Sequence, residues 1–446
     1  MANRKQNLGF LFGYGVGDFG LNIYWNSLSL ILVFWYADVV GLEPYIAGFI
    51  YSVGVFWDAI SDPIIAIIAA RNRSRHGAYR PFILYGGVGL SLSFSLLFWM
   101  PPLEGGWLII HLCLVHMLFR TTYTLVAVPY AAMSSRLSFD SQERIELSGI
   151  RMMFAFAGLL VVSGCWFPLS RFFGNGDESS PTGFFLTAVV GAALATVVLT
   201  ICFFATEEKT PPGVTKVQGL RSFLVAFRGN PALRVLLLTI FLHSAATASF
   251  NIPLAFFIEA NEGLFAAKEV VMTAFALVTL VSVSLWTYLS AKLGRKRTWL
   301  IATALIALLG VWFLVFGPFL VAGVPVQIIL FGVGFSAFSV LVWSYIPDTV
   351  EFGQYAHGER AEGAVFGLVL FVKKFSGVII GITVGAVLTW VGYDASLETQ
   401  EPDIATRLGY FLTIMPSILL ILSTVVIMRL PLDRHLHAKI VDELSG

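Results

Sequence analysis

Twelve long apolar stretches divide this chain of 446 residues, and each is close to the length of a membrane-spanning helix. A hydrocarbon core about 30 Å thick needs ~20 mostly apolar helical residues for each crossing. Breaks at charged residues and at clusters of proline and glycine place the stretches at about residues 8–37, 44–70, 81–100, 106–132, 147–171, 183–206, 232–258, 265–290, 298–319, 323–347, 365–390 and 406–430. The sequence therefore predicts an all-α membrane protein with twelve transmembrane helices.

The composition excludes most soluble classes. Only 12% of the residues are charged and 57% are hydrophobic, whereas soluble chains are about a quarter charged. The net charge of +1 gives no basic surface for nucleic acid. The three cysteines lie in apolar runs without a pairing or zinc pattern, and we expect no cofactor beyond a coupling ion. Residues 1–7 run into the first stretch without a cleavage site, so we interpret that stretch as a span and not a signal peptide.

The longest connection, 207–231, falls near the middle of the chain. It predicts an N-terminal six-helix bundle over 1–206, a cytoplasmic linker over 207–231, a C-terminal bundle over 232–430 and a cytoplasmic tail over 431–446. Most lysines and arginines lie in the N-terminal segment (Arg4, Lys5), the even-numbered connections and the tail. The opposite connections hold only Arg171, Lys268 and Arg407. The positive-inside rule then places both termini in the cytoplasm, with the chain in the plasma (inner) membrane.

An internal repeat supports two equivalent halves. Glu143–Glu146 (ERIE) follows the fourth predicted span, and Glu359–Glu362 (ERAE) follows the tenth, about half the chain later. Two parallel six-helix repeats about an axis along the membrane normal are the arrangement of major facilitator transporters. The repeat therefore predicts the major facilitator fold.

Seven ionisable residues lie inside predicted spans, where a charge costs at least ~2.5–3.5 kcal/mol and needs a cavity or a partner. They are Asp18, Asp58, Asp62, Arg120, Arg151, Lys373 and Lys374. One interpretation is that they pair only to join helices. The other, which we favour, is an ion or substrate pathway.

Asp58 and Asp62 are one helical turn apart and share a face. Two carboxylates this close in a low dielectric require that one is protonated or that a cation lies between them. Ser61 and, on a neighbouring helix, Thr124 would add hydroxyl ligands, so the pair predicts a Na⁺ or H⁺ site. The alternative for Asp62 alone is that it bonds backbone groups freed by Pro63.

Asp18, Asn22 and Trp25 lie along one face of the first predicted helix. A carboxylate, an amide and an indole on one stripe suit a polyhydroxyl ligand, although Trp25 is equally typical of a membrane interface. Arg151, Lys373 and Lys374 would add positive charge, with only one lysine facing the cavity because adjacent helical residues diverge. Arg120 lines the cavity or neutralises an aspartate. His111, His116 and His243 are expected to be packed residues.

Several dispersed motifs resemble the glycoside-pentoside-hexuronide:cation symporters, the family of melibiose permease. The motifs span most of the chain and are Tyr14–Phe19 (YGVGDF), Tyr36–Leu42 (YADVVGL), Trp57–Pro63 (WDAISDP), Arg73–Pro81 (RSRHGAYRP), Val128–Tyr130 (VPY) and Asp348–Gly363 (DTVEFGQYAHGERAEG). The resemblance implies a cation-coupled symporter that works by alternating access. It assigns the cation site to Asp58, Asp62, Thr124 and Ser61, and the sugar site to Asp18, Trp25, Arg151 and Lys374.

The chain departs from this family at three positions. Ser61 replaces an asparagine of melibiose permease, which makes H⁺ a serious alternative to Na⁺. Ala127 and Ala131 stand where the family has sugar-contacting side chains. Together with the extra Arg120, these changes favour an anionic sugar (a hexuronide, glucuronide or sulfonated sugar) over a neutral disaccharide. Lysophospholipid carriers also resemble this family, so an amphiphile stays an alternative.

We expect a monomer in the lipid bilayer that takes up a small sugar-like molecule. A cytoplasmic gate of loop charges would hold the outward-facing state, although an ordinary solvated loop is the alternative. Its predicted members are Arg144, Glu146, Asp348, Glu351, Arg360 and Glu362. A competing class is an intramembrane Mg²⁺-dependent prenyltransferase, because DxxxD occurs there too, but such enzymes need a second acidic cluster.

Overall fold

The computed structural model describes residues 8–72, 74–177, 179–209, 220–261, 265, 268–358, 360–393, 401–432 and 434–445. Five parts of the predictions lie outside these residues: Arg4, Lys5, Arg73, Glu359 of the second repeat, and residues 210–219 of the linker. The described residues form long helices and one short hairpin.

The helices follow the predicted stretches in order. The first half contains α1 (Leu8–Ser27), α2 (Pro44–Arg71), α3 (Arg80–Leu97), α4 (Gly105–Leu137), α5 (Ser141–Phe173) and α6 (Pro181–Ala205). The second half contains α8 (Pro231–Glu259), α9 (Lys268–Leu293), α10 (Arg295–Phe316), α11 (Val326–His357), α12 (Glu362–Val391) and α13 (Pro402–Met428). Two shorter helices, α7 (Leu220–Gly229) and α14 (Arg434–Ser445), and the antiparallel strands β1 (Leu320–Val321) and β2 (Val324–Pro325) complete the chain.

Among the described residues, eleven helices are long and apolar enough to cross a membrane. The remaining predicted span corresponds to α1, which continues as two π-helical segments, η1 (Leu28–Leu32) and η2 (Trp35–Val39). The helical path is unbroken from residue 8 to 39. The prediction of an all-helical membrane protein is confirmed.

The predicted boundaries are wrong at one end of the molecule. Helix α4 continues to Leu137, α5 begins at Ser141, and α11 continues to His357. The sequence criterion ended these spans at the charged residues that flank them. Several of those charges, among them Arg144, Asp348 and Glu351, are buried and paired with one another, which allows the helices to continue.

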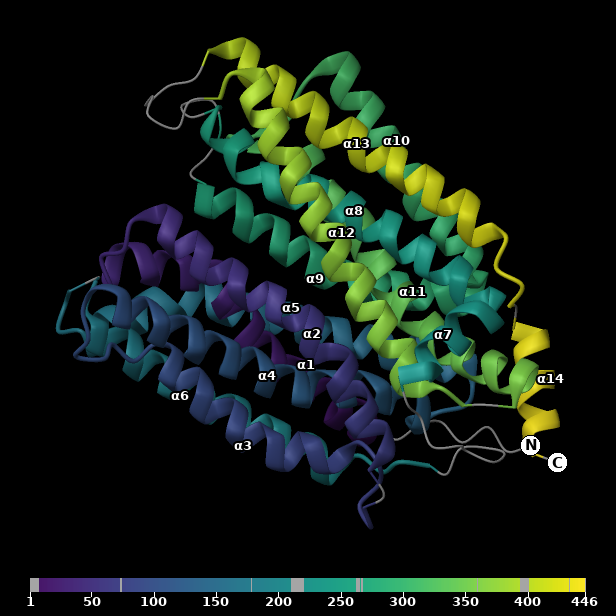
Figure 1. Ribbon diagram of the computed structural model, residues 1–446. Coiled ribbons are helices and arrows are strands. Elements are labelled where there is room, and N and C mark those ends of the chain that lie inside the picture. Colours follow the sequence, from purple (N-terminus) through teal and green to yellow (C-terminus); the bar gives the residue numbers. More distant parts are fainter. Residues whose placement is uncertain are drawn as a thin grey trace.

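Figure 1 shows α1–α6 as one group of helices, purple to teal, and α8–α13 as a second group, teal to yellow. Helix α1 packs on α5 and α6, and α8 packs on α12 and α13. The two groups touch where α5 meets α9 and α11, and where α2 meets α12. Small residues allow close approach inside a group: a Cβ atom at Gly13 of α1 would collide with Ala205 of α6.

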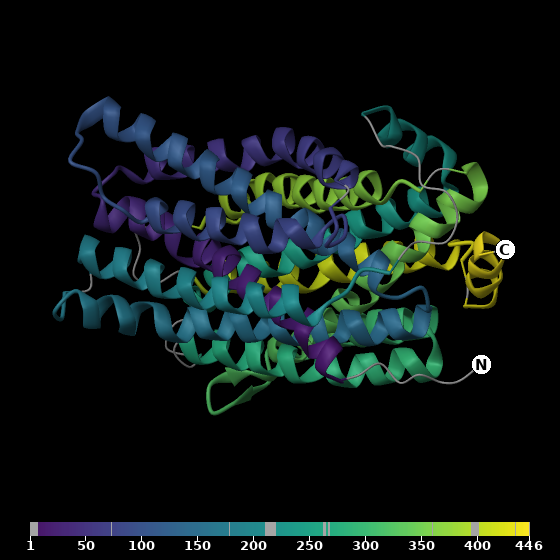
Figure 2. The same cartoon turned by 90° about the horizontal axis from the view of Figure 1, so that it is seen from below.

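Both short helices lie at the same end of the bundle (Figures 1 and 2). We call it the α14 end. Here α4 and α11 end, α5 and α12 begin, and α14 packs on α11 and α5. Segments of both groups meet at this end, so it can hold the two groups together.

Candidate functional site

The central acid pair, Asp58 and Asp62 on α2, is almost fully buried, with 1% of each residue exposed. Thr124 of α4 donates to Asp62 Oδ1 at 2.8 Å, and Lys374 Nζ of α12 donates to Asp62 Oδ2 at 2.6 Å. The structure thus brings Thr124 to the pair, as the sequence predicted. Lys374 was assigned to the sugar site, but it lies on the acid pair.

Two basic side chains neutralise this pair. Arg120 Nη1 lies 2.8 Å from Asp58 Oδ2, and Lys374 Nζ lies 3.1 Å from the same oxygen. The sequence predicted a protonated acid or an intervening cation at the pair, and it left open whether Arg120 lines the cavity or neutralises an aspartate. The structure places Arg120 and Lys374 against the carboxylates, so Arg120 neutralises Asp58. Lys374 belongs to the second helix group, so this contact also joins the two groups.

Two polar atoms at the acid pair are buried without a hydrogen-bond partner among the described residues: Asp58 Oδ1 and Ser61 Oγ. The oxygens of Asp62 are both occupied. A Na⁺ ion needs several oxygen ligands, and only these two are unpartnered here.

His116 positions Arg120, a role that the sequence interpretation missed. Arg120 Nε lies 3.1 Å from His116 Nε2, and His116 Nδ1 lies 3.2 Å from the carbonyl oxygen of Ile50 on α2. Both contacts are satisfied if Nδ1 carries the proton, donating to Ile50, and Nε2 accepts from Arg120. The spacing of four residues between His116 and Arg120 could have revealed this pair.

A second buried cluster surrounds Asp18. Arg151 Nε of α5 donates to Asp18 Oδ2 at 2.6 Å. The Arg151 guanidinium lies 5.0 Å from the ring centre of Tyr130 and 4.4 Å from that of Trp343 on α11. Trp343 was not predicted, because an isolated tryptophan in an apolar span gives no signal. We call Asp18, Arg151, Lys373 and Trp343 the Asp18 cluster.

Lys373 belongs to this cluster and not to the acid pair. Its Nζ atom lies 4.9 Å from the ring centre of Trp343, and no carboxylate of the described residues lies within ion-pair distance of it. The expectation that only one of the two lysines faces the cavity stays a prediction. Because they diverge along α12, Lys374 reaches the acid pair and Lys373 reaches the Asp18 cluster.

The other predicted substrate residues lie beside these clusters. The Asn22 amide donates to the backbone oxygen of Asp18 at 2.9 Å. The half-buried Trp25 has its ring centre 5.8 Å from that of Tyr123 and 5.7 Å from the Arg120 guanidinium. Trp25 therefore packs inside the helix group, which disfavours the interfacial interpretation.

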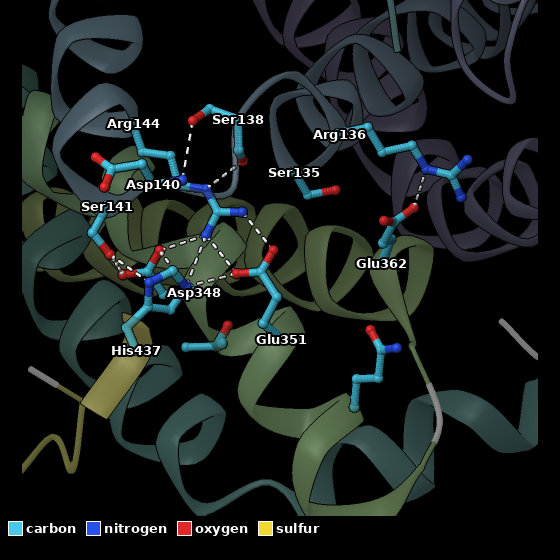
Figure 3. A network of polar contacts seen from close by, with 12 residues as sticks. Ser135, Arg136, Ser138, Asp140, Ser141, Arg144, Asp348, Glu351, Glu362 and His437 are labelled. Atoms are coloured by element: carbon cyan, nitrogen blue, oxygen red, sulfur yellow. Dashed lines mark hydrogen bonds and ion pairs between the residues drawn. The ribbon is translucent and has the colours of Figure 1, made fainter. Parts of the chain in front are cut away.

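A third cluster, which we call the gate network, lies at the α14 end (Figure 3). Arg144 lies 2.6 Å from Asp348 and 2.5 Å from Glu351. Arg360 lies 2.5 Å from Glu362 and 3.5 Å from Glu351. The structure contradicts a loop location for Arg144, Asp348 and Glu351, which lie on α5 and α11. All five residues are at most 1% exposed, which also excludes a solvated loop.

Glu146 does not belong to the gate network, contrary to the prediction. It is exposed and forms none of the ion pairs found among the described residues. Residues 144 and 146 are two positions apart on α5 and so point in different directions. Of the charged residues Arg144 and Glu146, Arg144 is the one that pairs with acids of the second helix group.

Four members of the gate network were missed. Arg295 lies 2.6 Å from Asp348, and Arg136 lies 2.8 Å from Glu362. His437 of α14 lies 2.8 Å from Glu351 (Figure 3). The Tyr79 hydroxyl donates to Glu362 at 2.7 Å, and burial raises the pKa of Tyr79 well above its usual value, so the proton stays on the hydroxyl.

Comparison with known proteins agrees with this geometry. The sequence profile of the MFS/sugar transport protein family matches residues 13–434. A candidate glycoside/cation symporter of Escherichia coli K12, YagG, is 31% identical over 91% of this chain and 88% of its own length. A candidate sulfoquinovose importer of Salmonella typhimurium is 28% identical, covering 87% and 82%. A glucuronide carrier protein homolog of E. coli is 25% identical, covering 100% and 97%.

The solved structures support the fold alone. The crystal structure of the E. coli fucose:proton symporter, FucP, superposes with a TM-score of 0.66 at 12% identity, covering 92% of this chain and 98% of that one. The predicted major facilitator fold is thereby confirmed, and the prenyltransferase alternative is dropped. From the family match and the shared fold, the chain belongs to the MFS/sugar transport protein family, and it is a membrane transporter, not an enzyme.

Proposed function

We propose that this protein is a cation-coupled symporter that takes up an anionic sugar by alternating access. The coupling ion is H⁺, and the sugar carries one carboxylate or sulfonate group. The relatives named for glycoside/cation symport, sulfoquinovose import and glucuronide transport support this substrate class.

The proposal of an anionic substrate rests on the balance of charge among the central residues. Three acids face four basic side chains there: Asp18, Asp58 and Asp62 against Arg120, Arg151, Lys373 and Lys374. Arg120, Lys374 and Arg151 each contact a carboxylate, whereas Lys373, 4.9 Å from the Trp343 ring centre, forms none of the ion pairs found among the described residues. Leaving a charge uncompensated in a closed cavity is costly. A singly charged anion beside Lys373 removes that cost.

The surrounding groups suit a sugar ring. The Asp18 carboxylate accepts from sugar hydroxyls, and the Trp343 indole packs against the apolar C–H face of the ring. Arg151 is held by Asp18 at 2.6 Å and supplies further donors. Lys373 then selects for the charged substituent.

Coupling follows from the contact between Lys374 and Asp62. Protonation of Asp62 neutralises its carboxylate and removes the ion pair with Lys374, which links α2 to α12. Asp58 then faces both Arg120 and Lys374, so the protonated site carries one net positive charge. Proton binding thus loosens one contact between the helix groups and allows the cavity to change its access.

The closed gate network belongs to the outward-facing state in this proposal. The termini and the α14 end face the cytoplasm, in the orientation that the basic connections favour. The protein acts as a monomer in the inner membrane, and each helix group of six moves as a unit.

Binding of glucuronate, sulfoquinovose and an uncharged methyl glucoside to purified protein tests this function. The wild type should bind the two anions and not the neutral sugar. Lys373→Gln should weaken anion binding about 10–100-fold, the effect of losing one charge-assisted contact. Lys439→Gln, at a residue 72% exposed on α14, is the control.

Equal binding of the neutral sugar, or unchanged anion binding by Lys373→Gln, contradicts the anionic substrate. Tight binding of a lysophospholipid in place of any sugar would favour the amphiphile alternative.

A further inference from the structure

A cavity of about 370 Å³ opens at the α14 end, away from both central clusters. It lies between the two helix groups. Its wall comes from the start of α5 (Ser141, Gln142), the α9–α10 turn (residues 290–297), Tyr345 of α11 and Leu432. We call it the α9–α10 pocket.

The lining of this pocket is basic and contains no acid. Lys292, Arg295, Lys296 and Arg297 all contribute to the wall. Arg295 is held by Asp348 at 2.6 Å, and Lys296 donates to the carbonyl oxygen of Leu430 at 2.7 Å. Lys292 and Arg297 are exposed. Basic side chains gathered on one concave wall attract an anion.

Neutral donors converge on the same place. Helix α10 begins after Gly294, which has a φ of 84° and no capping side chain. The first backbone N–H groups of a helix have no intrahelical acceptor and carry a partial positive charge. Independently, Ser290 in the pocket wall is 1% exposed, and its hydroxyl has no hydrogen-bond partner among the described residues.

We propose that the α9–α10 pocket binds a phosphate group. The basic side chains, the start of α10 and the Ser290 hydroxyl form a site for a phosphodiester or for free phosphate. Next to it, Tyr288, Leu293 and Leu300 are exposed by 55%, 40% and 51%, so the headgroup of an anionic phospholipid can enter while its chains follow this apolar face.

Because the pocket lies between the two helix groups, a ligand bound there would affect transport. A phosphate there contacts α5 of the first group and the α9–α10 turn of the second. Ser141 and Arg295 line the pocket and also bind Asp348 of the gate network, at 2.8 Å and 2.6 Å. A ligand that bridges the groups in this state stabilises it over the state open at this end. The bound phosphate therefore slows opening of the gate.

The test measures thermal unfolding of the purified full-length protein. Phosphate is titrated against chloride at equal ionic strength. In a second arm, lipid nanodiscs contain either phosphatidylglycerol or phosphatidylcholine. We expect a saturable rise in Tm of about 2 °C or more with phosphate, with phosphatidylglycerol or with both.

Lys292→Gln with Arg297→Gln should abolish that rise. The matched control, Arg234→Gln with Lys439→Gln, removes two exposed charges elsewhere and should retain it. A rise with phosphatidylglycerol alone identifies the lipid headgroup, and a rise with phosphate alone identifies the free ion.

The proposal is overturned if neither arm raises Tm, or if both double variants lose the rise equally. The wild-type protein alone shows whether phosphate or phosphatidylglycerol raises Tm, even if the Lys292/Arg297 variant does not fold. Anionic-sugar binding is read separately, so failure here leaves the proposed function untouched.

Discussion

The gate network and the central acid pair are both buried clusters of acids and bases between the helix groups, but they differ in how completely they are satisfied. In the gate network, each carboxylate oxygen of Asp348, Glu351 and Glu362 accepts a hydrogen bond. In the acid pair, Asp58 Oδ1 and the neighbouring Ser61 hydroxyl have no partner among the described residues.

This difference separates two roles. A fully bonded network of buried charges is rigid, and losing one partner is expensive. A network with an unused acceptor, balanced by a flexible lysine, can exchange a partner at lower cost. The gate network therefore suits holding one state, and the acid pair suits binding and releasing a small ion.

The largest effect is expected for Asp62→Asn. The amide keeps a hydrogen bond to Thr124 but cannot bind and release a proton. Under an imposed pH gradient, accumulation of labelled anionic sugar in vesicles should fall to simple equilibration, while sugar binding persists. Asp403→Asn, 79% exposed on α13, serves as the control. Accumulation at the wild-type level by Asp62→Asn would remove this residue from the coupling site.

Arg144→Ala should have the next largest effect, now on stability. It leaves Asp348 and Glu351 buried with one guanidinium fewer, which costs about 3–5 kcal/mol. Thermal unfolding of the purified variant should show a large drop in Tm. Glu146→Ala, two residues away but exposed, should stay within about 0.5 kcal/mol. Similar Tm values for the two variants would contradict the assignment of Arg144, but not Glu146, to the gate network.

A smaller effect is expected for His437→Gln. The imidazole lies 2.8 Å from Glu351 and 2.9 Å from Ser141, so it contacts both helix groups. Glutamine replaces only part of these contacts, and we expect a loss of about 1–2 kcal/mol in the same unfolding measurement. An unchanged Tm would show that α14 adds nothing to the closed gate.

Much of the fold could be predicted, because length and apolarity define a membrane span almost without reference to tertiary structure. The predicted helix boundaries are wrong where ion pairs between distant parts of the chain determine how far a helix extends. Asp348 and Glu351 look like residues of a polar loop, yet they continue α11 because Arg144 and Arg295 neutralise them. No local sequence pattern predicts ion-pair partners that are so distant in the sequence.

The charged central residues could be identified from the sequence, because a charge inside a membrane span is energetically costly. The residues that pair with them could not be identified in this way. Spacing put Asp58 and Asp62 on one face, whereas only the packing of α2 on α4 and α12 shows that Arg120 and Lys374 meet them. Arg136, Arg295 and His437 were missed for a related reason. Each lies outside the predicted spans, where a charged residue is ordinary, and only its ion pairs and the burial of Arg295 and His437 make it unusual.

The two ERxE repeats no longer resemble each other in what they touch. Arg144 and Arg360 both reach Glu351, whereas Glu362 is buried and its counterpart Glu146 is exposed. Two identical copies facing each other across a dyad would set like charges against like and push the halves apart. Among the described residues, the acids that pair across this seam (Asp348, Glu351 and Glu362) lie on α11 and α12, and the first half meets them with Arg136 and Arg144, so opposite charges attract where strict symmetry would oppose like charges.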